Sequence, residues 1–198
     1  MLTRKEVQAN FAEALRLMDE FEFGNAPAQK AARKVADKLR DLGIPYVVIG
    51  GLAVAAHGHK RVTVDVDLLM TREGLAKFRG YMGMPETEHE VKMDVRTPDE
   101  KPGDGKSCPF NFPSPESLGM EMGGIWKGFR ILPLRELIEL KLASGLTSVT
   151  RLKDHVDVME LIKVNRLANE FGDRLHPFVR EKYKELWAAT QVKDPYEE

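Results

Sequence analysis

The chain has 198 residues, of which 42% are hydrophobic and 31% charged, and a net charge of -1. Such proportions suit one globular domain with an additional segment. Because the net charge is near zero, the protein as a whole has no positive electrostatic field that would attract nucleic acid. No run approaches the ~20 apolar residues that cross a membrane, and residues 1–10 are unlike a secretion signal. The single cysteine excludes an internal disulfide. We therefore expect a cytoplasmic protein with no membrane partner.

The first part of the chain is predicted to be helical. Four apolar residues recur at helical spacing and predict an amphipathic helix, namely Val7, Phe11, Leu15 and Met18. A second helix is expected after Pro27 and ends at Gly43.

Two strands with a short helix between them are predicted next. The run Tyr46 to Ile49 indicates a buried strand, and Gly50-Gly51 turns the chain into a helix over Leu52 to Ala56. Alternation predicts a further strand over Val62 to Met70, with Thr63, Asp65 and Asp67 on one face. The opposite, buried face would carry Val62, Val64, Val66 and Leu68.

A helix over 71–81 and a strand over Glu90 to Arg96 are expected to follow. Residues 98–115 contain five prolines and two glycines, which exclude regular structure and indicate a functional or mobile loop. The runs Leu118 to Met122 and Ile125 to Ile131 flank Gly123-Gly124 and predict a tight hairpin.

The remainder of the chain is predicted to be helical. One helix would cover Leu134 to Ala143 and be closed by Gly145, one would run from Thr150 to Lys163, and one from Pro177 to Ala189. We therefore expect an α/β (α+β) fold with a small mixed sheet flanked by helices. The expected divisions are an N-terminal helix in 1–27, a core in 28–132 and a helical C-terminal region in 133–198.

Residues 47–70 combine the features of a phosphate and metal site. Gly50 and Gly51 allow the backbone to approach phosphate oxygens closely. Asp65 and Asp67 would project from the same strand face, where two carboxylates ~5 Å apart repel by roughly 3 kcal/mol at an effective dielectric of about 20. A divalent cation would relieve this repulsion, and carboxylate oxygens favour Mg²⁺ or Mn²⁺.

This segment resembles the signature of the polymerase-beta-like nucleotidyltransferases. In that family a hydrophobic residue and two small residues precede a carboxylate–apolar–carboxylate strand by about a dozen residues. Here Ile49-Gly50-Gly51 is followed, after thirteen residues, by Asp65-Val66-Asp67. The resemblance implies the nucleotidyltransferase fold, and a third carboxylate on a neighbouring strand. Asp94 is the first choice for that acid and Glu90 the alternative.

Further segments resemble one bacterial branch, the AbiEii/AbiGii-type abortive-infection toxins. They include Arg61 and Thr63 before the acid pair, the proline-rich loop, and the sequences of 134–145 and 151–162. The resemblance implies that Gly50, Gly51, Arg61, Thr63, Lys141 and Lys153 bind the nucleotide. A structural alternative stays open for the two lysines, because Glu139, Asp154 and Asp157 are ordinary ion-pair partners.

The implied activity is transfer of a nucleoside monophosphate from a nucleoside triphosphate to an acceptor hydroxyl. Asp65, Asp67 and Asp94 would bind the metal, and Asp94 would act as base. The acceptor would be RNA (tRNA among them) or a partner protein, in a toxin–antitoxin or phage-defence setting. Two alternatives stay open: an aminoglycoside-like small-molecule acceptor, and a non-catalytic protein that binds nucleotide.

Overall fold

The computed structural model describes most of the chain. Its backbone is described over 4–22, 24–82, 87–88 and 91–192, and the side chains of 4–9, 11, 82, 87 and 88 are not described. Glu90, the alternative third acid, therefore lies outside the described residues.

Seven α-helices are described within these ranges, interspersed with short 3-10 turns. The helices are α1 (Arg4–Glu22), α2 (Pro27–Asp41), α3 (Gly50–Ala56), α4 (Arg72–Met82), α5 (Leu134–Thr147), α6 (Leu152–Val164) and α7 (Pro177–Thr190). The 3-10 turns are Gly124–Trp126, Val149–Arg151 and Asn169–Arg174. Within the described ranges, no helix is both long and apolar enough to cross a membrane.

The described strands form one mixed sheet in the order β3-β4-β2-β1-β6-β5. They are β1 (Tyr46–Val48), β2 (Val66–Met70), β3 (Thr87–Glu88), β4 (Val91–Arg96), β5 (Met120–Glu121) and β6 (Arg130–Ile131). At the centre, β1 pairs antiparallel with β2 and parallel with β6, while β2 pairs parallel with β4. The predicted α/β fold with a small mixed sheet flanked by helices is thus confirmed.

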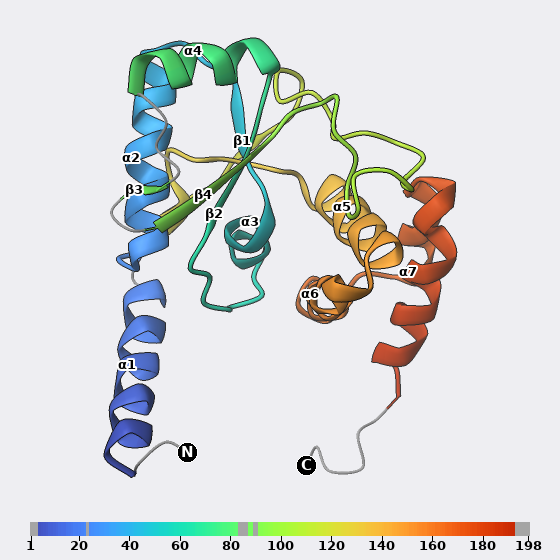
Figure 1. Ribbon diagram of the computed structural model, residues 1–198. Coiled ribbons are helices and arrows are strands. Elements are labelled where there is room, and N and C mark those ends of the chain that lie inside the picture. Colours follow the sequence, from blue (N-terminus) through green and yellow to red (C-terminus); the bar gives the residue numbers. More distant parts are fainter. Residues whose placement is uncertain (1–3, 23, 83–86, 89–90, 193–198) are drawn as a thin grey trace.

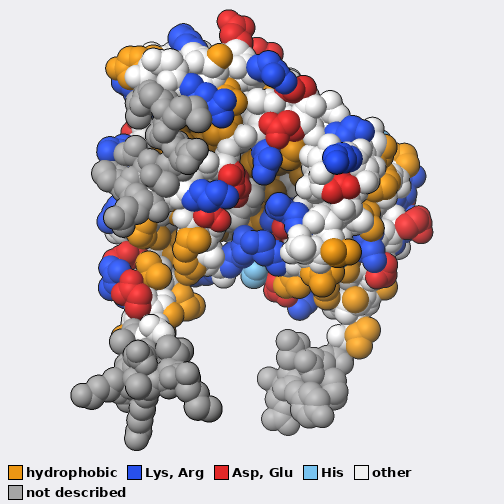
Figure 2. Space-filling model, viewed as in Figure 1, with side chains coloured by type: hydrophobic (Ala, Val, Ile, Leu, Met, Phe, Trp, Pro, Cys, Tyr) orange, Lys and Arg blue, Asp and Glu red, His pale blue; other side chains and the backbone are white. Residues whose placement is uncertain are grey.

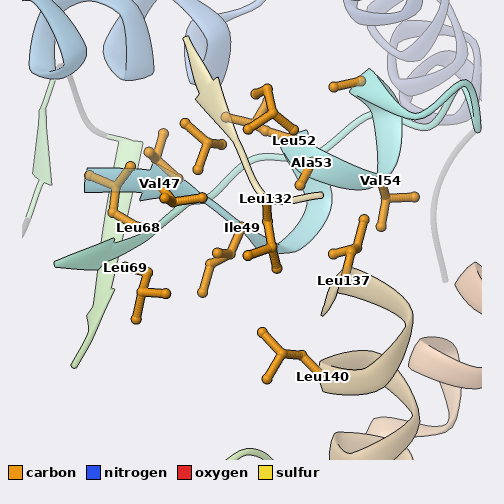
Figure 3. Close-up of a cluster of buried hydrophobic side chains, with 14 of the residues drawn as sticks. Val47, Ile49, Leu52, Ala53, Val54, Leu68, Leu69, Leu132, Leu137 and Leu140 are labelled. Carbon is orange, nitrogen blue, oxygen red and sulfur yellow. The ribbon is translucent and has the colours of Figure 1, made fainter. Parts of the chain in front are cut away.

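The sheet lies between two groups of helices (Figure 1). The α1–α2 pair runs along one side, and α5, α6 and α7 gather on the other. The core forms where β1, β2, α3 and the start of α5 converge (Figure 3). Val47, Leu68, Leu69, Leu132 and Leu137 are all at most 1% exposed there. Burial of such side chains contributes about 1.5–3 kcal/mol each, so this convergence holds α3 and the N-terminal end of β2 together.

The second predicted strand is shorter than expected. β2 begins at Val66, because its pairing with β4 begins there and its pairing with β1 extends only over Leu68 to Met70. Asp65 lies at a bend before the strand, and Val64 is 68% exposed, so the prediction of a buried Val64 was wrong. Because residues 62–65 pair with no described strand, their side chains are not held on alternate faces of a sheet.

The α5 helix does not close at Gly145 but continues to Thr147. A Cβ at Gly145 would lie 2.4 Å from Nε2 of His155 on α6. The glycine therefore allows α5 and α6 to approach closely within the helical pair, rather than ending the helix. The short helix before β2 likewise begins at Gly50, two residues before the predicted start.

The predicted hairpin is present but not tight. β5 and β6 are two residues each, and the 3-10 turn Gly124–Trp126 stands between them. The proline-rich loop has no regular structure, as predicted, and is packed at several points. Cys108 is fully buried, and Phe110 contacts the ring of His176 with a centroid distance of 4.6 Å.

Candidate functional site

The sheet brings two of the predicted acids together. Asp67 on β2 and Asp94 on β4 are direct partners in the parallel register of these strands. Asp65 precedes Asp67 by two residues, at the bend where the chain enters β2. We call Asp65, Asp67 and Asp94 the site acids. All three are partly exposed, so solvent and solutes can reach them.

Gly50 and Gly51 lie directly against the site acids. Gly50 has a φ of +62°, and a Cβ there would lie 1.9 Å from Oδ2 of Asp67. A side chain at this position would therefore be strained and would displace the carboxylate. The backbone N–H of Gly51 acts to lower the pKa of the Asp67 carboxyl. The structure thus places the glycine pair next to Asp67, and nucleotide binding by Gly50 and Gly51 stays a prediction.

Arg61 and Thr63 cover Gly51 from the segment that leads into β2. A Cβ at Gly51 would lie 2.7 Å from Oγ1 of Thr63 and 2.9 Å from Nη2 of Arg61. The side chain of Arg61 is 26% exposed, so its guanidinium is partly shielded but accessible. A hydroxyl, a guanidinium and a backbone amide thus converge beside the site acids, in a set of donors that suits a phosphate group.

Asp67 is the site acid whose protonation is most affected by its surroundings. Burial raises its pKa above the ordinary value, and the carboxylates of Asp94 and Asp65 add to the rise. Lys141 and the backbone N–H of Gly51 oppose this rise in the pKa. The ionised form is therefore destabilised at this position until more positive charge is brought near.

Asp94 has a cationic partner of its own. Nζ of Lys92 donates to Oδ2 of Asp94 at 2.8 Å, and both side chains project from the same strand. In the described part of the chain, no three His, Cys, Asp or Glu side chains are arranged to hold a metal ion. The Lys92 contact turns the Asp94 carboxylate to a partner within its own strand. Metal binding by Asp94 would thus compete with this ion pair.

Lys141 lies in a buried group of opposite charges. Its Nζ is 2.6 Å from Oδ1 of Asp154 and 2.7 Å from Oδ2 of Asp157, which lie on α6. Nε of Arg151 donates to Asp154 at 2.9 Å. Nε of Arg61 lies 3.3 Å from Oδ1 of Asp157, without the alignment of a hydrogen bond. We call these five residues the buried network.

The buried network connects the helical part of the chain with the candidate site. Arg61 belongs to it and also reaches Gly51, and Lys141 acts electrostatically on Asp67. Lys153, in contrast, is exposed on α6 next to the buried Asp154. Of the two predicted lysines, the structure relates Lys141 to the site acids.

Sequence reasoning underestimated two acids. Asp154 and Asp157 were interpreted as ordinary ion-pair partners, yet their side chains are 0% and 4% exposed. A signal was present, because residues three apart on a helix share a face and apolar residues such as Val158 and Leu161 adjoin them. Lys92 was also missed, although it lies two residues from Asp94 and so on the same strand face.

Comparison with known proteins yields no matching family model and no matching curated protein.

Proposed function

We propose that this protein is a metal-dependent nucleotidyltransferase. One observation carries the proposal: Asp67 and Asp94 are neighbours on parallel strands, and the Asp67 carboxylate lies against Gly50 at the start of α3. Acids in adjacent strands repel each other, and burial further disfavours ionised Asp67. This arrangement is expected where a cation compensates the cost.

The site acids suit Mg²⁺ or Mn²⁺ by their chemistry. All three offer hard carboxylate oxygens, which these ions prefer. Asp65 and Asp67 would hold the ion, and Asp94 would join them after release from Lys92. When bound, the ion would supply charge neutralisation for the phosphates and the leaving group.

The chain's own residues would orient the nucleoside triphosphate and the acceptor. Arg61, Thr63 and the N–H of Gly51 would bind phosphate oxygens, and Lys141 would add positive charge near Asp67. The acceptor hydroxyl would form a bond to the α-phosphorus while the bond to the pyrophosphate oxygen breaks. Asp94 would take the hydroxyl proton, and pyrophosphate would leave. The acceptor would be RNA, tRNA among them, or a protein of a toxin–antitoxin or phage-defence system.

A non-catalytic protein that binds nucleotide is the second candidate. The ion pair of Lys92 with Asp94 favours it, because a lysine already neutralises the third acid. The variant Lys92→Met separates the two candidates. A transferase would keep or increase its activity and need less Mg²⁺, since Asp94 would be freed for the metal.

The test is turnover of labelled nucleoside triphosphates with Mg²⁺ or Mn²⁺, with total tRNA and cell extract as acceptors. Asp67→Asn should lower the rate by at least about 1,000-fold, which corresponds to roughly 4 kcal/mol of lost stabilisation. The matched control is Asp37→Asn, an exposed acid paired with Arg40 on α2, which should retain full activity. Undiminished transfer by Asp67→Asn would refute the proposal, and metal-dependent binding without transfer to any acceptor would favour the second candidate.

A further inference from the structure

Among the described side chains of α1, the apolar ones are covered by the rest of the chain only at one end. Phe21 in the last turn is 6% exposed and meets the ring of Trp126 at a centroid distance of 6.4 Å. Earlier in the same helix, Leu15 is 51% and Met18 60% exposed. Most of the stability of a helix in a protein comes from packing of its apolar face, so such a face calls for a partner.

A groove of about 1060 Å³ continues this apolar face onto the body of the protein. Its apolar walls are formed by Leu15 and Met18 of α1 and by Val62, Ile125 and Trp126 opposite them. Figure 2 shows hydrophobic side chains gathered beside the upper part of α1. Contiguous exposed apolar surface of this kind is typical of interaction sites.

Several charged side chains at the groove have partners within the chain. Nη2 of Arg16 lies 2.6 Å from Oε1 of Glu13, and its Nη1 lies 2.6 Å from Oε1 of Glu20. Lys60 forms an ion pair with Glu22. Arg61, at the far wall, is directed toward Asp157. A polyanion would therefore gain little at this rim, and an apolar partner with mixed charges fits it better.

We propose that the partner is a second copy of this chain, paired through α1 in antiparallel orientation about a two-fold axis near Ala14. The sequence of the helix supports this pairing because its ends differ in charge. Arg4, Lys5 and Glu6 stand at its start, with one net positive charge, and Asp19, Glu20 and Glu22 stand at its end. An antiparallel partner brings each basic start beside an acidic end and opposes the two helix dipoles.

The position of Ala14 favours the same arrangement. At helical spacing Ala14 shares a face with Met18 and Phe21 and is itself exposed. A small residue at the crossing point allows two helices to approach closely, within the usual 8–10 Å or so between axes. The exposed Leu15 and Met18 of each copy would then be covered by the other.

The first test is the mass of the full chain by sedimentation or light scattering across concentrations. We expect a concentration-dependent dimer whose affinity falls at least about 100-fold in the double variant Leu15→Glu, Met18→Glu. Val156→Glu, at a 56% exposed apolar position on α6, is the matched control and should dimerise normally. A wild-type chain that stays monomeric at about 100 µM, or a dimer unaffected by the double variant, would overturn the proposal.

A second test checks the geometry with two alanines of the same helix. Ala14→Cys should form a disulfide between copies under mild oxidation, whereas Ala12→Cys, exposed on the opposite face, should not. The native Cys108 is fully buried and does not compete. Equal cross-linking of the two variants would contradict the two-fold pairing. Both tests are independent of nucleotidyl transfer.

Discussion

The protein contains two groups of acidic side chains, and the surroundings of each group differ. In the buried network, Asp154 and Asp157 are nearly inaccessible and have Lys141, Arg151 and Arg61 as partners. Among the site acids, Asp67 adjoins Asp94 and Asp65, and burial raises its pKa. In the first group three cationic side chains face two acids, so neither acid is left without a positive partner. The second group retains a surplus of negative charge, which the fold tolerates at a cost and a ligand could relieve.

The largest expected effect on stability comes from breaking the buried network at its centre. Lys141→Met would leave the buried Asp154 and Asp157 without the lysine that contacts both. Loss of one partner of a buried charge pair costs about 3–5 kcal/mol. Chemical denaturation should show a decrease of this size in the free energy of unfolding. Lys153→Met, at the exposed neighbour of Asp154, serves as the control and should change little.

Low pH should remove part of the contribution of Asp154 to the free energy of unfolding. Burial alone would raise its pKa, but Lys141 and Arg151 outweigh burial and hold the pKa below its ordinary value. Stability from this group is therefore present above the unfolded pKa of about 4 and lost as pH falls through the lower folded pKa. The difference in the free energy of unfolding between wild type and Asp154→Asn should be largest at pH 7 and should decrease below about pH 4. A gap that is constant across this range would contradict the assignment.

At the site acids we expect a smaller effect of pH on the free energy of unfolding, opposite in sign to that of Asp154. The folded pKa of Asp67 is raised, so its ionisation destabilises the folded state as pH rises above the unfolded value of about 4. At pH 7, Asp67→Asn should unfold at a temperature equal to or above that of the wild type. Mg²⁺ should raise the melting temperature of the wild type more than that of the variant. A clear destabilisation by Asp67→Asn would indicate that this acid has a structural role.

Local sequence patterns predicted the strands and the helix that form the candidate site. They failed where the pairing of strands determines the end of an element. The β-branched runs around Val47 and Val66 identified two buried strands, and a third strand was predicted over Glu90 to Arg96. That its Asp94 adjoins the acid pair was implied only by the family resemblance. The beginning of β2 depends on where its neighbours start to pair. A single sequence carries little information on that register, and so Val64 was misplaced.

Helix packing was the other source of error. Gly145 was interpreted as a helix end, because a glycine there more often closes a helix than makes room for a neighbour. Only the contact with His155 on α6 explains its actual role. The burial of the ion pairs of Lys141 was missed for the same reason, since the burial of Asp154 follows from how α5 and α6 meet rather than from either sequence alone.

The proline-rich loop has an exposed tip, Asp104 to Ser107, between the buried Pro102 and Cys108. The strand β6, which follows the loop, pairs with β1, which precedes it. A protease that cuts the tip would therefore leave two pieces joined through the sheet. The site acids would belong to the first piece and Lys141 to the second. The chain thus offers a natural point of division for a two-fragment reporter, whose signal would depend on reassembly of the candidate site.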